Sequence, residues 1–188
     1  MGKIVISENV TLDGVVQDPA GDEGFTRGGW VGRIGGRGRD EAAKVGLAEA
    51  LDTEAMLLGR RTYEFLAARW PFRTGEWADR LNSKPKYVVS STLENPDWNN
   101  TAVLTGDLVA AVRNLKETVN GDIVVSGSLQ LVHTLIEHDL LDELRLLIYP
   151  VILGAGERLF VETSETKRLR LIDNVTVNDL AFVTYRTG

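Results

Sequence analysis

The sequence predicts an α/β fold with a mixed, mostly parallel sheet flanked by helices and a C-terminal antiparallel hairpin. Short β-branched runs alternate with helical patterns through the middle of the chain, and this alternation is typical of βαβ units. The last third is richer in strand patterns, which favours an antiparallel edge on the same sheet. Because the chain has 188 residues, of which 43% are hydrophobic, we expect a single domain over residues 1–188.

The first predicted elements are separated by a long irregular segment. Residues 3–7 are β-branched and predict a strand, whereas residues 13–39 are rich in Gly, Arg and Asp and show little periodicity. Irregular segments of this length inside a domain are usually functional or mobile, so we expect a binding loop or a lid. A helical pattern begins at Asp40, which is a suitable N-cap.

The remaining elements follow one another closely. The same criteria predict strands over 53–59, 87–90, 102–105, 122–126 and 144–149, and helices over 60–68, 76–82, 107–119 and 128–136. A loop is expected over 150–156. The chain should end in a hairpin of strands 174–177 and 180–185, with its turn at Asn178 and Asp179.

Composition narrows the class of function. The net charge of −6 disfavours nucleic acid as the main partner, and the absence of Cys excludes disulfides, thiolate zinc sites and cysteine nucleophiles. No signal-peptide pattern and no membrane-length apolar run is present, so we expect a cytoplasmic protein without a membrane partner. Arginines nevertheless gather locally, which suits a small phosphorylated ligand: Arg27, Arg33, Arg37, Arg39, Arg60 and Arg61.

Gly59-Arg60-Arg61-Thr62 is the first candidate site. A buried strand ends at the glycine and a helix begins there, so main-chain N–H groups at the helix start are free to bind an anion. Two adjacent arginines add donors that match phosphate. A glycine turn with two solvated arginines explains the same residues about equally well.

Two further strand ends carry similar groups. Ser126-Gly127-Ser128-Leu129-Gln130 again joins a strand to a helix, where Gly127 allows close approach of a ligand and Ser128 can cap the helix. Ser90 and Ser91 follow another strand, at the edge where open α/β sheets bind ligands. Taken singly, an ordinary capped helix and a polar loop are the better interpretations. Together, the three strand ends predict one extended ligand with several phosphates.

Other chemistry is weakly supported. His133 and His138 are five residues apart and do not share a helix face, so no metal site is expected. The chain has neither a nucleophile elbow nor a P-loop.

With these motifs in view, the chain resembles the dihydrofolate-reductase-like superfamily. More narrowly, it is similar to the C-terminal reductase domain of the bifunctional riboflavin-biosynthesis deaminase–reductase, in a stand-alone form. The motifs that carry the resemblance are 11–14 (TLDG), 58–63 (LGRRTY), 89–91 (VSS), 125–128 (VSGS) and 150–156 (PVILGAG), in that order along nearly the whole chain.

The resemblance implies an NADPH site, often in a homodimer. The implied cofactor-binding residues are Gly59, Arg60, Arg61, Thr62, Ser90, Ser91, Ser126, Gly127, Ser128, Leu129 and Gln130. Arg61 would read the 2′-phosphate, the two serines would lie near the adenosine, and residues 126–130 would hold the pyrophosphate. Residues 14–38 would form a flexible loop over the nicotinamide and the substrate. The implied substrate-binding residues are Asn9, Asp13, Gly14 and Trp30, with Asp13 as the candidate catalytic group.

One departure from the family pattern bears on function. Dihydrofolate reductases carry an acidic residue on the helix before the Gly-Arg motif, and the corresponding position here is Ala43. We therefore expect an NADPH-dependent oxidoreductase that reduces a heterocycle or ribosylamino-pyrimidine rather than folate. The alternative is a module that binds a nucleotide, flavin or other small ligand without turnover. A purely structural protein is disfavoured by the Gly/Arg-rich loop.

Overall fold

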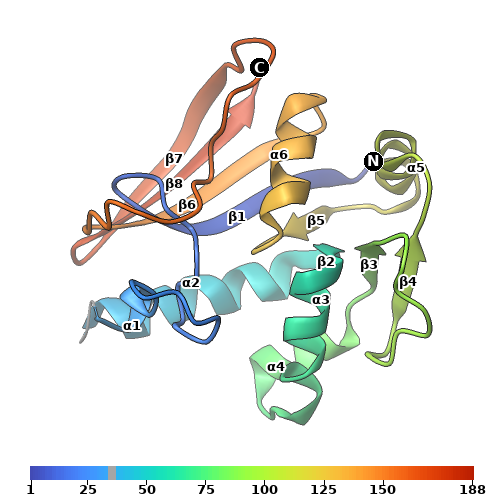
Figure 1. Ribbon diagram of the computed structural model, residues 1–188, viewed down its shortest axis with the longest axis horizontal. Coiled ribbons are helices and arrows are strands. Elements are labelled where there is room, and N and C mark those ends of the chain that lie inside the picture. The colour runs from blue at the N-terminus through green and yellow to red at the C-terminus, as the bar shows by residue number, and fades with distance from the viewer. Residues whose placement is uncertain (34–36) are drawn as a thin grey trace. The chain divides into compact units, whose positions relative to one another are not determined.

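The computed structural model describes residues 1–33 and 37–188, with the side chains of 37–39 and 177 outside the description. In these residues the strands are β1 (Lys3–Thr11), β2 (Thr53–Gly59), β3 (Lys86–Val89), β4 (Thr101–Leu104), β5 (Asp122–Val125), β6 (Glu143–Tyr149), β7 (Leu169–Val177) and β8 (Leu180–Thr187) (Figure 1). The helices are α1 (Trp30–Arg33), α2 (Arg37–Asp52), α3 (Arg60–Ala67), α4 (Glu76–Ser83), α5 (Leu108–Thr118) and α6 (Leu129–Glu137), with a 3₁₀ turn, η1 (Trp70–Phe72).

The strands form one mixed sheet in the order β4-β3-β2-β5-β1-β6-β8-β7. The pairs β1–β5, β2–β5, β2–β3 and β3–β4 are parallel, and β6–β8 and β7–β8 are antiparallel. The predicted fold class is therefore confirmed, including the C-terminal hairpin. Asn178 adopts a left-handed conformation in the hairpin turn, with φ of 53°.

Three boundaries differ from the predictions by three residues or more. β1 continues to Thr11, and β7 begins at Leu169, five residues before the predicted start. The prediction of Asp40 as an N-cap is wrong, because α2 begins at Arg37 and Asp40 lies in its first turn. The sequence hid this start because Gly38 is unfavourable inside a helix by about 1 kcal/mol.

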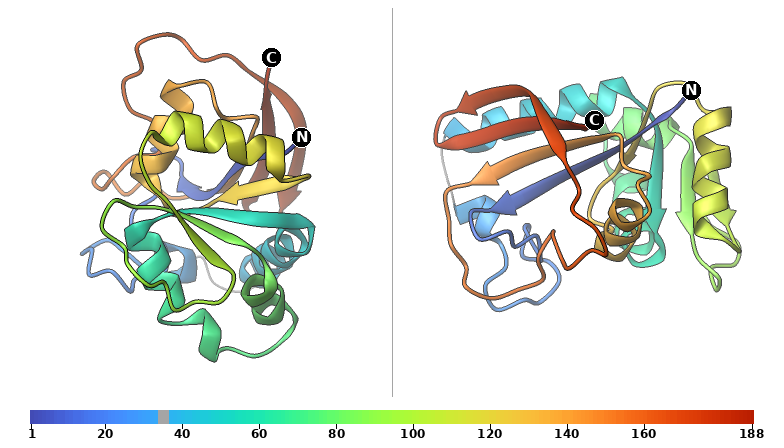
Figure 2. Two further views of the ribbon diagram at one scale, coloured as in Figure 1. Left: turned by 90° about the vertical axis from the view of Figure 1, so that its right-hand side faces the viewer. Right: turned by 90° about the horizontal axis from the view of Figure 1, so that it is seen from above.

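The chain divides into two compact units. Unit 1 comprises residues 1–6 and 47–142, and unit 2 comprises residues 7–46 and 143–188. β1 runs through both, since its first four residues belong to unit 1 and the rest to unit 2. In unit 1, α5 lies on one side of the strands while α3 and α4 lie on the other (Figure 2).

The core of unit 1 is apolar and aromatic. Strands β2 and β3 supply Met56, Leu58 and Val88, which pack with Tyr63 and Trp98. None of the helices in the described ranges is long and apolar enough to cross a bilayer.

A buried lysine joins the end of α4 to the loop before β4 in unit 1. Lys86 is 0% exposed at the start of β3, and its Nζ donates to the carbonyls of Lys84 at 2.8 Å, Asn82 at 3.0 Å and Asn99 at 3.2 Å. The ammonium lies 4.3 Å from the ring centroid of Trp98. Burial lowers the pKa of Lys86 to about 8.

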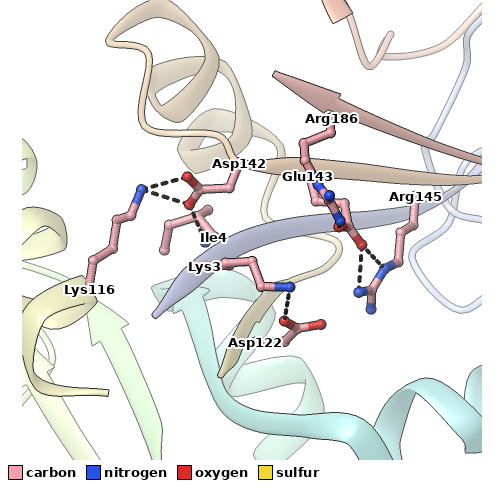
Figure 3. Close-up of polar contacts among 8 residues, drawn as sticks. All are labelled: Lys3, Ile4, Lys116, Asp122, Asp142, Glu143, Arg145 and Arg186. Carbon is pink, nitrogen blue, oxygen red and sulfur yellow. Dashed lines mark hydrogen bonds and ion pairs between the residues drawn. The ribbon is translucent and has the colours of Figure 1, made fainter. Parts of the chain in front are cut away.

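Ion pairs fix the start of β1 within unit 1 (Figure 3). The Asp142 carboxylate accepts from Lys116 Nζ at 2.6 Å and from the Ile4 amide at 2.7 Å. Lys3 pairs with Asp122 at 3.2 Å, directly opposite it in the β1–β5 register. These contacts hold the amino end of the central strand to its neighbours.

Unit 2 has its own core and its own ion cluster. Trp30 and Tyr149 meet edge to face at 5.2 Å, in a cluster with Leu147 and Leu180. The buried carboxylate of Glu143 accepts from two arginines: Arg145 and Arg186 donate to it at 2.6 Å and 3.0 Å (Figure 3).

The segment after β1 is irregular up to Gly29, as predicted, and closely hydrogen-bonded, whereas the end of the predicted irregular segment 13–39 contains α1 and the start of α2. The buried Asp18 accepts from the amides of Glu23 and Phe25 through its carboxylate, and from those of Gly21 and Gly29 through its carbonyl. Asp18 thus holds residues 21–29 of the predicted loop 14–38 in place through hydrogen bonds to their amides. Residues 34–36 of that loop lie outside the described residues.

Candidate functional site

Two strand-to-helix junctions of unit 1 are joined directly. β2 and β5 are parallel neighbours, so their carboxyl ends lie at the same edge of the sheet, where α3 and α6 begin (Figure 1). The Gly59 amide donates to Ser128 Oγ at 3.0 Å, and Thr62 Oγ1 donates to the Gly127 carbonyl at 2.9 Å. The first and second candidate motifs therefore form a single structure.

The starts of α3 and α6 are not capped by side chains. Ser128 was predicted to cap α6, and this is wrong, because its hydroxyl accepts from the other junction instead. Gly127 has a left-handed φ of 67°, which turns the chain sharply between β5 and α6. Two adjacent helix starts whose amides are not taken by a capping side chain form a site for an anion, and a diphosphate would suit both.

The end of β3 adds the third motif. Ser90 Oγ accepts from the amides of Thr92 and Leu93, which forms a tight turn after the strand. Arg60 Nη1 donates to Thr92 Oγ1 at 2.6 Å, so the first arginine of α3 reaches the turn that follows Ser91. The geometry thus brings all three predicted strand ends together within unit 1.

The two arginines of α3 differ in their surroundings. Both are exposed, but Arg60 donates to Thr92 and pairs with Glu64 at 3.2 Å, whereas Arg61 makes no such contact with the described residues. Glu64 was not among the predicted site residues, although its place four residues after Arg60 on a helix is the spacing of an ion pair.

Asp13 joins two loops of unit 2. Its carboxylate accepts from Thr11 Oγ1 at 2.7 Å and from the amides of Gly154 at 2.8 Å and Leu153 at 3.2 Å. Its carbonyl accepts from Arg158 Nη1 at 2.7 Å. The Thr11 hydroxyl, with the two amides, lowers the pKa of Asp13 from 3.8 to about 2. Donating a proton near neutral pH does not suit such a carboxylate, and its contacts indicate a positioning role.

The other predicted substrate residues also lie in unit 2. Asn9 is half-buried in β1, and Gly14 has a φ of 81° in the turn that follows the strand. The Trp30 ring is 1% exposed, and its Nε1 donates to the Gln17 carbonyl at 3.0 Å. Trp30 therefore packs in the core of unit 2 in this structure, and its role in substrate binding stays a prediction.

Comparison with known proteins gives consistent matches. The model of the RibD C-terminal domain family matches residues 2–180. Among curated proteins, the uncharacterized protein YyaP of Bacillus subtilis (strain 168) is 27% identical, over 93% of this chain and 88% of YyaP.

Two solved structures show the same fold. A Shewanella sp. PV-4 protein, provisionally named for riboflavin biosynthesis, has a TM-score of 0.76 at 21% identity, with 99% of both chains covered. Dihydrofolate reductase from Enterococcus faecalis, solved with NADP(H), has a TM-score of 0.61 at 15% identity, over 99% of this chain and 96% of the reductase.

Proposed function

Because the chain belongs to the RibD C-terminal domain family, we propose that it is an NADPH-dependent reductase of a heterocycle or ribosylamino-pyrimidine. The reaction would resemble that of 5-amino-6-(5-phosphoribosylamino)uracil reductase. The observation that carries the proposal is the direct bonding of the β2–α3 and β5–α6 junctions, with Arg60 extended to the end of β3. The E. faecalis neighbour supports a nicotinamide cofactor, since that enzyme was solved with NADP(H).

The residues present fit a dinucleotide with an additional phosphate. The helix starts at Gly59 and Ser128 would bind the pyrophosphate through main-chain amides, and Arg60 and Arg61 would neutralise the phosphate on the adenosine. Bound NADPH would supply the hydride, and the protein would supply binding and orientation. The amides and arginines named here would bind and orient the cofactor, and none of them would take part in the hydride transfer itself.

On the substrate side, the proposal assigns positioning rather than proton transfer. Asn9 and Gly14 would border the substrate, while Asp13 would keep the chain after β1 attached to residues 153–154. With Ala43 in place of an acidic residue and Asp13 held ionised, the proton needed for reduction would come from solvent.

A cofactor titration tests the proposal. NADPH should bind saturably to the purified protein, as followed by nucleotide fluorescence. Arg61→Ala should weaken NADPH about tenfold or more and NADH much less, because a charged hydrogen bond to phosphate contributes about 1.5–3 kcal/mol. Arg60→Ala, measured in parallel, shows how the two arginines share the 2′-phosphate.

The exposed Arg113 on α5 offers a matched control, and Arg113→Ala should bind both cofactors as the native chain does. Failure of both NADPH and NADH to bind would reject the proposal. Equal losses for the two cofactors in Arg61→Ala would show that this residue does not read the 2′-phosphate.

A second candidate is a binding module without turnover. It is favoured by one observation, the lack of a protonatable acid at Asp13 and Ala43. An absorbance spectrum of the purified protein separates the two candidates. Tightly held flavin would support the module, whereas NADPH consumption with an aminouracil or pteridine substrate would support the reductase.

A further inference from the structure

The loop after β6 already binds one anion of the chain itself. The consecutive amides of Leu153 and Gly154 donate to the two oxygens of the Asp13 carboxylate, at 3.2 Å and 2.8 Å. The Thr11 hydroxyl contributes most to the low pKa of Asp13, and this row of two amides adds to it, as expected for donors that face a negative charge. This loop is the motif 150–156 that carries part of the family resemblance, and none of its residues belongs to the proposed dinucleotide site.

The next two amides of the same row are available. Those of Ala155 and Gly156 have no acceptor within residues 1–33 and 37–188, and Ala155 is exposed. Gly154 and Gly156 have φ of 73° and 120°, whereas Ala155 between them has no positive φ. Such sharp turns at the two glycines can bring successive N–H groups to one side of the loop, where they would bind an anion.

Arg27 adds positive charge beside this row. Its Nη1 donates to the Leu153 carbonyl and lies 3.2 Å from the position that a Cβ on Gly154 would occupy. Arginine has five N–H donors, so one bond to a carbonyl fixes the guanidinium and leaves donors for a ligand. Arg158, which donates to the Asp13 carbonyl, brings a second cation to the same loop.

We propose that the amides of Ala155 and Gly156, together with the Arg27 guanidinium, form a phosphate site in unit 2. The site would hold the phosphate group of the molecule to be reduced, so this part of the inference rests on the proposed function. An arginine beside main-chain amides suits a phosphate monoester, which presents several acceptor oxygens to planar and main-chain donors together.

Residue-resolved NMR of the ¹⁵N-labelled full chain tests the site with inorganic phosphate as the probe. The amide signals of Ala155 and Gly156 should shift to low field and saturate. Arg27→Ala should weaken this binding about tenfold or more, since it removes a charged hydrogen bond. Arg170→Ala, an exposed arginine of β7, should leave the titration unchanged.

Unmoved signals at Ala155 and Gly156, or equal affinities for Arg27→Ala and the native chain, would overturn the site. Signals of Gly59 and Ser128 report NADPH binding separately in the same spectra, so failure of the proposed function is distinguishable. In turnover, Arg27→Ala should raise KM for a phosphorylated ribosylaminouracil and leave KM for its dephosphorylated form unchanged. Phosphate binding without this difference would overturn the assignment to the substrate.

Discussion

In each unit one charged side chain joins separate segments of the chain: Lys86 in unit 1 and Asp13 in unit 2. Their charges are stabilised in different ways. In unit 1, Lys86 donates to three carbonyls from a fully buried position. In unit 2, Asp13 accepts from two amides and a hydroxyl while half-exposed. Both pKa values are lowered, yet the meaning is opposite, because a lowered pKa disfavours the charged form of a base and favours that of an acid.

This difference between Lys86 and Asp13 shows which main-chain groups in each unit remain available to a ligand. The Lys86 ammonium donates to carbonyls that would otherwise be buried without a donor. Its role is therefore to stabilise the core and not to bind a ligand. Asp13 occupies the first two amides of a longer row and leaves the next two open to a ligand. The partly exposed Asp13 thus leaves neighbouring amides for the proposed phosphate site, whereas the buried Lys86 only satisfies buried carbonyls.

The largest effect is expected from Lys86→Met. The variant leaves three main-chain carbonyls without a donor, and we expect a loss of about 3 kcal/mol in the free energy of unfolding. Urea unfolding measures it. Because the folded pKa of about 8 lies below 10.5, the unfolded chain binds more protons between these values, and the stability contributed by Lys86 rises with pH there.

Below pH 8 Lys86 is protonated in both the folded and the unfolded chain, so the stability advantage of the native chain over Lys86→Met should be constant there. If this advantage falls between pH 8 and 10.5, burial does not lower the pKa of this lysine. Lys44→Met removes an exposed lysine that pairs with Glu41 at 2.6 Å, and should change stability little.

A pair of glycine variants tests how closely the two loops of unit 2 pack. In Gly156→Ala the new Cβ would lie 2.6 Å from Val15 Cγ1 and 3.2 Å from the Phe25 ring, at a φ of 120°. In Gly154→Ala it would meet Arg27 Nη1 alone, the end of a long side chain, at 3.2 Å. We expect losses of about 2 and about 1 kcal/mol in thermal unfolding. Equal losses would show that backbone conformation, not packing, dominates.

The anion of unit 2 is tested by Asp13→Asn, which keeps the shape and removes the charge. We expect a loss of about 1–2 kcal/mol at pH 7, because charge-assisted bonds to Thr11, Leu153 and Gly154 become neutral or are lost. The folded pKa of about 2 lies below 3.8, so the contribution of Asp13 is complete above 3.8 and disappears as pH falls through 2.

Urea unfolding at pH 7 and near pH 2 measures this contribution. The native chain and Asp13→Asn should differ at the higher pH and converge at the lower. A difference that persists in acid would show that shape, rather than the ionised carboxylate, holds the loops together.

Local patterns were enough to predict most of unit 1. Predicted strand 53–59 coincides with β2, and the helix predicted from Arg60 is α3, because a buried apolar run and a glycine mark these boundaries. The convergence of Gly59, Ser90 and Ser128 at one edge also followed from the parallel strand order.

Unit 2 was harder to predict because its contacts are long-range. Asp13 meets residues 140 and 141 positions away in the chain, and Glu143 meets Arg186 across the β6–β8 pair. Sequence periodicity carries no information on such partners. Asp13 could therefore be recognised as a polar residue near a turn, while its hydrogen bonds to the Leu153 and Gly154 amides, which favour the ionised carboxylate, could not.

The smallest effect concerns the bond between the two helix starts of unit 1. Ser128→Ala removes the acceptor of the Gly59 amide, and we expect a loss of about 1 kcal/mol in stability. NADPH affinity should fall a few-fold, because the freed amide no longer holds the β2–α3 junction against α6. Ser126→Ala changes the exposed serine of the same turn and should leave stability unchanged. Calorimetry with and without NADPH separates the two effects, and a loss of affinity equal in both variants would show that the turn, rather than the Gly59–Ser128 bond, positions the cofactor.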